Sequence, residues 1–153
     1  MKIAGSSHVP LPRERAYALL QDPEVLARSM PGCDGLDKVD DNTYRMKMKI
    51  LMASFSGLFD GKVHLSDPNP PESFRLSVEG SGRIGFLNGN GLLTLVPAED
   101  GTEVRYEGDV QVGGAIAAVG QRLLDATARK IIKNFFEKLV SEANQDTASA
   151  SGA

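Results

Sequence analysis

The spacing of hydrophobic residues changes once along this 153-residue chain, and that change constrains the fold more than any other feature. Over residues 35–112 apolar and polar residues alternate, as in Tyr44-Arg45-Met46-Lys47-Met48, which is typical of strands with one buried and one solvated face. Over residues 117–140 the period becomes that of an α-helix with one apolar stripe. A long helix that follows such strands has to cover the apolar face of their sheet.

The residues before the alternating run predict one further strand and two short helices. Residues 2–9 have a weak strand pattern that ends at Pro10 and Pro12, and a short helix is expected from there to Leu20. The sequence Asp22-Pro23-Glu24 predicts the start of a second helix, with an N-cap, a proline in the first turn and an acidic residue. The expected fold is therefore α+β, with seven strands, two short helices after the first strand and a long C-terminal helix.

Length and composition favour one ordinary globular domain. Hydrophobic residues make up 41% of the chain, charged residues 24%, and the net charge is −3, so the sequence lacks the basic excess of a nucleic-acid-binding protein. Residues 1–140 are expected to form the domain, and the Ala/Ser-rich residues 141–153 a disordered polar tail.

The chain is expected to work in a reducing compartment. Its single cysteine, Cys33, cannot form an internal disulfide, which fits the cytoplasm. No apolar run has the length of a signal peptide or of a membrane span. Any contact with a membrane is therefore expected to be peripheral.

The two ends of the expected sheet differ in chemistry, because alternate turns of a meander fall at the same end. One set of turns, at 40–42, 67–72 and 98–101, is acidic or proline-containing. The other set, at 53–59, 82–91 and 113–118, is rich in glycine and contains Phe55, Leu58, Phe59, Phe86, Leu87 and Ile116. Such apolar loop residues either plug the end of the core or form the mouth of a cavity whose lip touches a membrane or a partner. The sequence leaves both interpretations open.

No arrangement of residues predicts a catalytic or metal centre. Residues 80–85 spell G-x-G-x-x-G but lead into another strand instead of a helix, which indicates a glycine-rich hairpin and no nucleotide site. The histidines, His8 and His64, have no Cys or His at ligand spacing, and Cys33 has no histidine nearby. We therefore expect no catalytic residue, no metal ligand and no intrinsic cofactor.

Two groups of side chains allow both a structural and a functional interpretation. Met46, Met48 and Met52 either fill the core or form a flexible wall against an apolar ligand. The basic side chains on the outward face of two neighbouring strands either are simply solvated or attract anionic lipid. These are Arg45, Lys47, Lys49 and Lys62.

Four motifs in order resemble the G-subunit family of carbon monoxide dehydrogenase, and the resemblance covers residues 2–139. The motifs are D-P-E-V-L-A at 22–27 with M-P-G-C at 30–33, F-S-G at 55–57, S-D-P-N-P-P-E at 66–72, and G-G at 113–114 followed by A-V-G-Q-R-L-L-D at 118–125. The family belongs to the START-like (SRPBCC), helix-grip superfamily. The resemblance implies a seven-stranded curved antiparallel sheet wrapped around the long helix, with a cavity for a hydrophobic ligand.

The resemblance also implies a role. The chain is expected to be a non-enzymatic accessory protein that binds a respiratory quinone or lipid and links a molybdenum hydroxylase of the carbon monoxide dehydrogenase type to the membrane. It would be cytoplasmic and peripheral on the inner face of the cell membrane, touching it through loops 53–59, 82–91 and 113–118.

The residues expected to contact the ligand are inward positions of the strands, apolar loop residues and the start of the long helix. They are Met46, Met48, Ile50, Phe55, Leu58, Phe59, Phe74, Leu76, Phe86, Leu93, Leu95, Tyr106, Val110, Ile116, Gly120 and Leu124.

The sequence is also compatible with two other functions. The superfamily includes cyclases and hydratases that act inside the same cavity, and Tyr106 is the obvious inward polar candidate for such chemistry. The second is that of a protein-interaction module, in which the apolar loops form a docking patch and no ligand is bound.

Overall fold

The computed structural model describes residues 1–52 and 55–151, and the side chains of residues 34, 51–56 and 145–151 lie outside the description. The elements in order are β1 (Lys2–Val9), α1 (Arg13–Gln21), α2 (Pro23–Ser29), β2 (Cys33–Asp40), β3 (Thr43–Met52), β4 (Phe55–Asn69), β5 (Ser73–Gly82), β6 (Gly85–Ala98), β7 (Gly101–Gly113), the 3-10 helix η1 (Ala115–Val119) and α3 (Gln121–Ser151). The expected α+β layout is confirmed.

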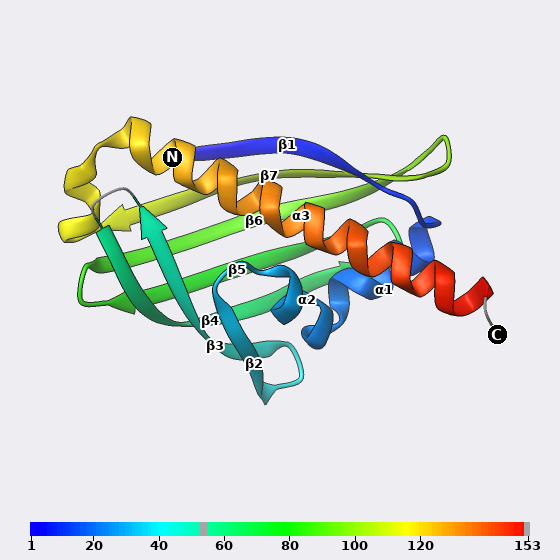
Figure 1. The fold of residues 1–153 in the computed structure, drawn as a ribbon, viewed down its shortest axis with the longest axis horizontal. Coiled ribbons are helices and arrows are strands. Elements are labelled where there is room, and N and C mark those ends of the chain that lie inside the picture. Colours follow the sequence, from blue (N-terminus) through cyan, green and yellow to red (C-terminus); the bar gives the residue numbers. More distant parts are fainter. Residues whose placement is uncertain (53–54, 152–153) are drawn as a thin grey trace.

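The strands form one seven-stranded antiparallel sheet in the order β1-β7-β6-β5-β4-β3-β2. Strands β2 to β7 follow one another as a meander, and β1 pairs with β7 at the far edge. Gly82 pairs with Gly85 across a two-residue turn, so the G-x-G-x-x-G segment is a hairpin as expected. Figure 1 shows the sheet curving beneath α3, which crosses it obliquely with α1 and α2 beside its C-terminal half.

The start of α2 follows directly from its sequence. The Asp22 carboxylate accepts a hydrogen bond of 2.9 Å from the Glu24 amide. Pro23 occupies the first turn, where a backbone N–H would have no acceptor within the helix, so the lack of one in proline costs nothing. This helix packs against both β2 and α3. It therefore closes the side of the molecule between the sheet edge at β2 and the long helix.

Both ends of the long helix differ from the sequence prediction. Residues 115–119 form η1, and Gly120, with φ of +97°, separates it from α3, because this backbone conformation cannot continue a right-handed helix. At the other end α3 runs past residue 140, and Ala143 is completely buried. The long helix thus continues past residue 140, where the sequence analysis placed the end of the domain: residues 141–144 are helical, and Ala143 packs in the core.

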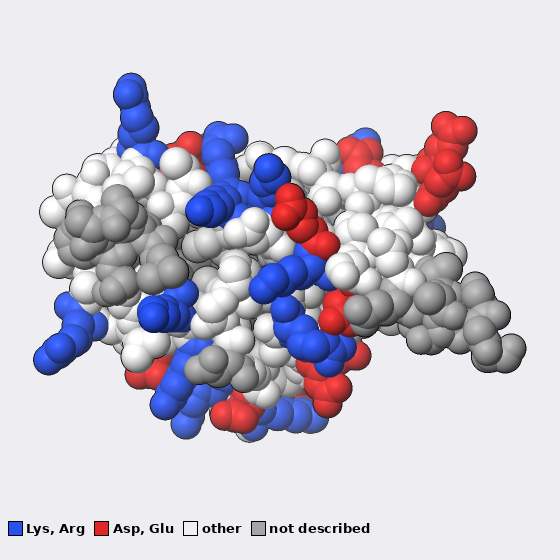
Figure 2. All heavy atoms as spheres, viewed as in Figure 1, with Lys and Arg blue, Asp and Glu red and all other residues white. Residues whose placement is uncertain are grey.

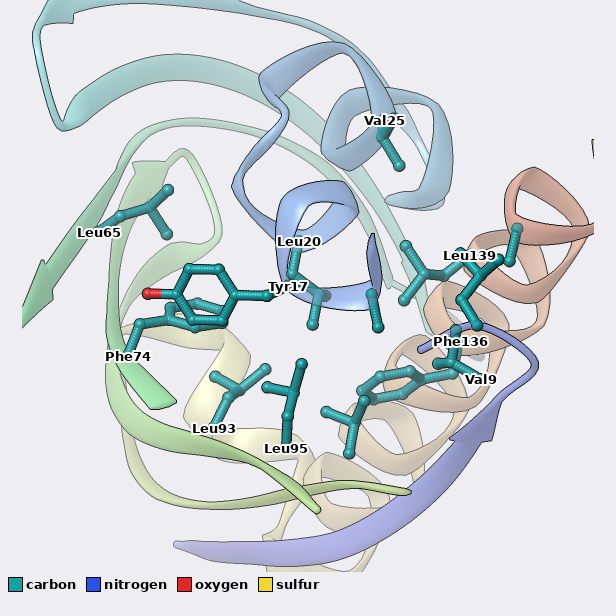
Figure 3. Close-up of a cluster of buried hydrophobic side chains, with 14 of the residues drawn as sticks. Val9, Tyr17, Leu20, Val25, Leu65, Phe74, Leu93, Leu95, Phe136 and Leu139 are labelled. Carbon is teal, nitrogen blue, oxygen red and sulfur yellow. The ribbon is translucent and has the colours of Figure 1, made fainter. Parts of the chain in front are cut away.

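The buried side chains form two separate groups. The main cluster joins α1, the sheet and the second half of α3, and Figure 3 shows Tyr17 edge-on to Phe74, with ring centroids 5.6 Å apart. The second cluster contains Met48, Ile50, Phe59 and Ile116, at the glycine-rich end of the sheet. Since the two clusters fill opposite ends of the space between sheet and helix, the middle is free for a cavity.

Candidate functional site

A cavity of about 300 Å³ lies between the sheet and α3. Its walls include residues of the main cluster, such as Leu93 and Phe136, and of the second cluster, such as Met48 and Phe59. The cavity therefore lies between the two clusters. Met30, which follows α2, closes one side, and α3 supplies Ala128, Ile131, Ile132, Phe135 and Phe136.

Glycines on the inward side of the sheet leave this space unfilled. Strands β4 to β7 line the cavity with glycine at Gly61, Gly80, Gly89, Gly91 and Gly108. These positions lie on adjacent strands, with Gly61 opposite Gly80 and Gly91 opposite Gly108. At an inward position a larger side chain would project toward α3. Part of the sheet side of the cavity is therefore bare backbone between apolar side chains.

Some of these glycines are also required by the close approach of neighbouring strands. A Cβ at Gly61 would overlap the carbonyl oxygen of Glu79, and a Cβ at Gly108 would overlap that of Asn90. At Gly80, in contrast, a Cβ would lie 3.7 Å from both Leu87 Cγ and Phe59 Cβ, an ordinary contact distance. Gly80 thus leaves room that a small side chain could occupy.

An ion pair holds α2, and with it Met30, against α3. The Arg28 guanidinium donates from Nε to Glu142 Oε1 at 2.8 Å and from Nη2 to Oε2 at 3.1 Å. These hydrogen bonds and the opposite charge lower the pKa of Glu142 and raise the pKa of Arg28. The contact ties the wall of the cavity to a part of α3 that the sequence pattern assigned to a tail.

Half of the predicted ligand-contact residues lie in the cavity wall. The structure brings together Met46, Met48, Ile50, Phe59, Leu76, Leu93, Tyr106 and Val110 there. Their predicted role in ligand binding stays a prediction. Met46 and Met48 are buried and line the cavity, which agrees with the core-filling interpretation, and their role as a wall against a ligand stays a prediction. The Met52 side chain lies outside the described residues.

The other predicted residues lie elsewhere. Phe74 and Leu95 belong to the main cluster, Ile116 belongs to the second cluster, and Leu124 packs against the second cluster. Gly120 is exposed between η1 and α3. Leu58 and Phe86 are 69% and 47% exposed. The Phe55 side chain lies outside the described residues.

The apolar residues at the glycine-rich end of the sheet differ in exposure. Ile116 is 3% exposed and plugs the core, whereas Leu58 and Phe86 project outward. Leu58 lies opposite Lys49 on the outer face of the sheet. Figure 2 shows lysine and arginine side chains projecting from this end of the molecule.

The residues predicted from the sequence did not include Met30 or the α3 residues that line the cavity. Ile131 and Phe135 lie on the apolar stripe of the helix that faces the sheet. This period alone would have placed both residues in the predicted set. The inward glycines were also overlooked, although their positions have the same parity as the apolar residues of their strands.

The cavity wall has little chemistry of its own. Asn90, Glu107 and Asp109 also border the cavity, but they occupy outward positions of their strands. Among the inward side chains of the described cavity wall, Tyr106 is the one with an oxygen atom, and its ring stacks on Phe136 with centroids 5.5 Å apart. General acid-base catalysis needs positioned titratable groups that act together. Within residues 1–52 and 55–151 there is no cluster of three His, Cys, Asp or Glu side chains suited to a metal ion. In the same residues no helix is long and apolar enough to cross a membrane.

Comparisons with known proteins agree on the fold. A crystal structure of a conserved protein from Geobacillus kaustophilus is 32% identical with a TM-score of 0.90, over 95% of this chain and 96% of that one. A START superfamily protein from Mycobacterium smegmatis is 16% identical with a TM-score of 0.73, over 94% of this chain and 97% of that one. The Zhui aromatase/cyclase from Streptomyces sp. R1128 is 11% identical with a TM-score of 0.70, over 100% and 99%. The last two similarities establish the fold of this chain and nothing about its function, because the sequences are only 16% and 11% identical.

Sequence comparison narrows the assignment further. No curated protein sequence matches this chain. The family model of the carbon monoxide dehydrogenase G subunit (CoxG) matches residues 5–144, which is nearly the whole described domain. The chain belongs to the CoxG family of carbon monoxide dehydrogenase, and its fold is START-like.

Proposed function

We propose that this chain is a non-enzymatic carrier that holds a hydrophobic ligand, a respiratory quinone or a lipid, between its sheet and α3. The observation that carries the proposal is the cavity of about 300 Å³ with apolar side chains and bare glycine backbone for walls. Ligand pockets commonly have volumes of about 300–1,000 Å³ and mainly apolar linings. Membership of an accessory-subunit family supports a carrier over an enzyme.

Transfer of such a ligand from a bilayer is energetically easy. The ligand exchanges one apolar environment for another, so the net free energy is small, whereas leaving water would contribute roughly 25 cal/mol per Å² of apolar surface. Uptake and release can therefore both be reversible, which a carrier requires.

We further propose that the glycine-rich end of the sheet touches the membrane. Leu58 and Phe86 are exposed there, and Lys49 lies opposite Leu58 on the outer face. Apolar side chains that enter the headgroup layer beside cations are typical of peripheral contact with anionic lipid. The contact loops would be 53–59, 82–91 and 113–118.

The partner proposed from the family name is a molybdenum hydroxylase of the carbon monoxide dehydrogenase type. In this role the chain works in the cytoplasm, on the inner face of the cell membrane, and passes its ligand between the enzyme and the bilayer.

Native mass spectrometry of protein purified from a quinone-containing bacterium tests the carrier function. We expect an added mass that solvent extraction identifies as a quinone or lipid. The matched control is the double variant Leu58→Ser/Phe86→Ser, which removes the exposed apolar side chains but no cavity wall. When both proteins are loaded with the extracted molecule in detergent solution, without a bilayer, the variant should take it up as wild type does. Wild-type protein purified without a bound molecule, or a variant that cannot be loaded in detergent, would contradict a cavity-bound ligand.

A further inference from the structure

A second hollow, of about 480 Å³, lies between β1 and residues 125–140 of α3. Its strand side includes Lys2 and Ser6, and its helix side includes Arg129 and Lys133. Strand β1 and α3 are in contact, and Figure 1 shows them side by side near the N-terminus. We call this hollow the side groove.

The side groove and the apolar cavity share part of their walls. Ile3, Tyr106, Ile132 and Phe136 line both. The stacked rings of Tyr106 and Phe136, with an interplanar angle of 18°, therefore stand between the two spaces. A molecule that extends past these rings would have one end in the cavity and the other in the groove.

The groove differs from the cavity in chemistry. The four groove residues Asp125, Arg129, Lys133 and Glu137 follow one another at intervals of one helical turn, so the two cations are neighbours in the middle of the row. Adjacent like charges at this spacing destabilise a helix unless another group compensates them. Arg129 donates from Nε to Asp125 Oδ2 at 2.8 Å.

Several donors in the groove remain available. The hydrogen bond from Arg129 to Asp125 uses Nε, which leaves the two Nη groups to other acceptors. Within the part of the chain that the structure describes, neither Lys2 nor Lys133 has an ion-pair partner. Lysine and arginine side chains donate hydrogen bonds and accept none. The groove is therefore suited to a group that carries acceptor oxygens.

We propose that the side groove binds the oxygen-bearing head of the carrier's ligand while the apolar part lies in the cavity. This inference rests on the proposed carrier function and adds the orientation and the class of the ligand, an amphiphile with acceptor oxygens at one end. The cavity lies at the lower end of the usual size range, and the side groove adjoins it, so a long amphiphile can extend from one space into the other. The shared chemistry has two sources, a carboxylate lipid or a quinone.

Binding titrations with three probes test the assignment. They are palmitate, decylubiquinone and the oxygen-free fluorescent probe N-phenyl-1-naphthylamine. The variant is Lys2→Met/Lys133→Met, which keeps the aliphatic stems and removes both ammonium groups. The control is Lys130→Met/Lys138→Met, which removes two exposed cations of α3 that lie outside both linings.

We expect the groove variant to bind palmitate, decylubiquinone or both about tenfold more weakly, because charge-assisted hydrogen bonds are lost. Binding of N-phenyl-1-naphthylamine should not change, and the control variant should behave as wild type. A loss confined to palmitate assigns the groove to anionic lipids, and a loss confined to decylubiquinone assigns it to quinones.

Two results would overturn the head-group assignment and leave the carrier function intact. One is equal affinity of wild type and groove variant for both oxygen-bearing probes. The other is an equal loss for all three probes, which would show that the effect is not specific to the head. If wild-type protein binds none of the three probes, the carrier function is overturned as well.

Discussion

Single glycines decide the shape of the cavity at the scale of residues. Gly61 and Gly80 face each other on β4 and β5 and both line the cavity, yet their surroundings differ. A methyl group at Gly61 would overlap the Glu79 carbonyl oxygen of the neighbouring strand, whereas one at Gly80 would meet side chains at 3.7 Å. The first glycine allows the strands to approach, and the second leaves space for a ligand.

This difference predicts unequal effects of the same substitution. Gly61→Ala should reduce the free energy of unfolding by about 1–3 kcal/mol, because the strand has to shift. Gly80→Ala should change it by less than about 1 kcal/mol, since the lower entropy of the unfolded chain offsets any small repacking. Denaturant unfolding of both variants gives the comparison. Equal destabilisation by the two substitutions would contradict the difference in space around Gly61 and Gly80.

The alternation of side chains predicts which residues face inward but not how far along the strand the cavity extends. Phe74 and Leu76 have the same parity on β5, and Leu93 and Leu95 on β6. Leu76 and Leu93 line the cavity, while Phe74 and Leu95 lie deeper in the main cluster. The difference depends on where α1 packs onto the sheet, and this tertiary contact leaves no periodic signal in the sequence.

At the scale of elements, the strands were more predictable than the ends of the long helix. Alternation and turn residues identify the strands because each has one wet and one buried face. The Ala/Ser-rich composition after residue 140 looks like that of a tail, although Ala143 is buried against the rest of the domain. Because alanine is small and only weakly hydrophobic, its burial at a close contact is not visible in a hydrophobicity pattern.

The contact between α2 and α3 predicts a pH-dependent contribution to stability. The pKa of Glu142 is lowered in the folded protein by Arg28, so the contribution is present above the ordinary carboxyl pKa of 4.5. It is lost as the pH falls through the lowered folded value. The variant Glu142→Gln should therefore have a slightly lower Tm than wild type at pH 7, and the difference should shrink toward pH 3.

Thermal unfolding across this pH range measures the effect. Glu137→Gln on the same helix is the control, since Glu137 is exposed and has no ion-pair partner among the described residues. A Glu142→Gln deficit that persists unchanged at pH 3 would mean that packing, not the ion pair, joins the two helices.

For the whole molecule, the two ends of the sheet should behave differently toward lipid. Leu58 and Phe86 are exposed at the glycine-rich end, and Val39, which is 48% exposed, lies on β2 near the acidic turn at 40–42. We expect Leu58→Ser/Phe86→Ser to reduce co-flotation with phosphatidylglycerol vesicles, because both apolar anchors are lost. Val39→Ser should have no effect. An equal reduction in both variants would contradict a membrane contact at one end.

The cavity itself is tested by filling it from the helix side. Ala128 lines the cavity on α3, while Ala126, two residues earlier on the same helix, is exposed. Alanine and leucine both favour the helix, so Ala128→Leu and Ala126→Leu differ mainly in the space that the new side chain occupies.

Titration of the two variants and wild type with N-phenyl-1-naphthylamine is the most direct measurement. Wild type and Ala126→Leu should bind the probe with equal affinity, and Ala128→Leu should bind it about tenfold more weakly or worse, since the added side chain competes for the same volume. Equal binding by all three proteins, or no binding by wild type, would contradict a ligand site between the sheet and α3.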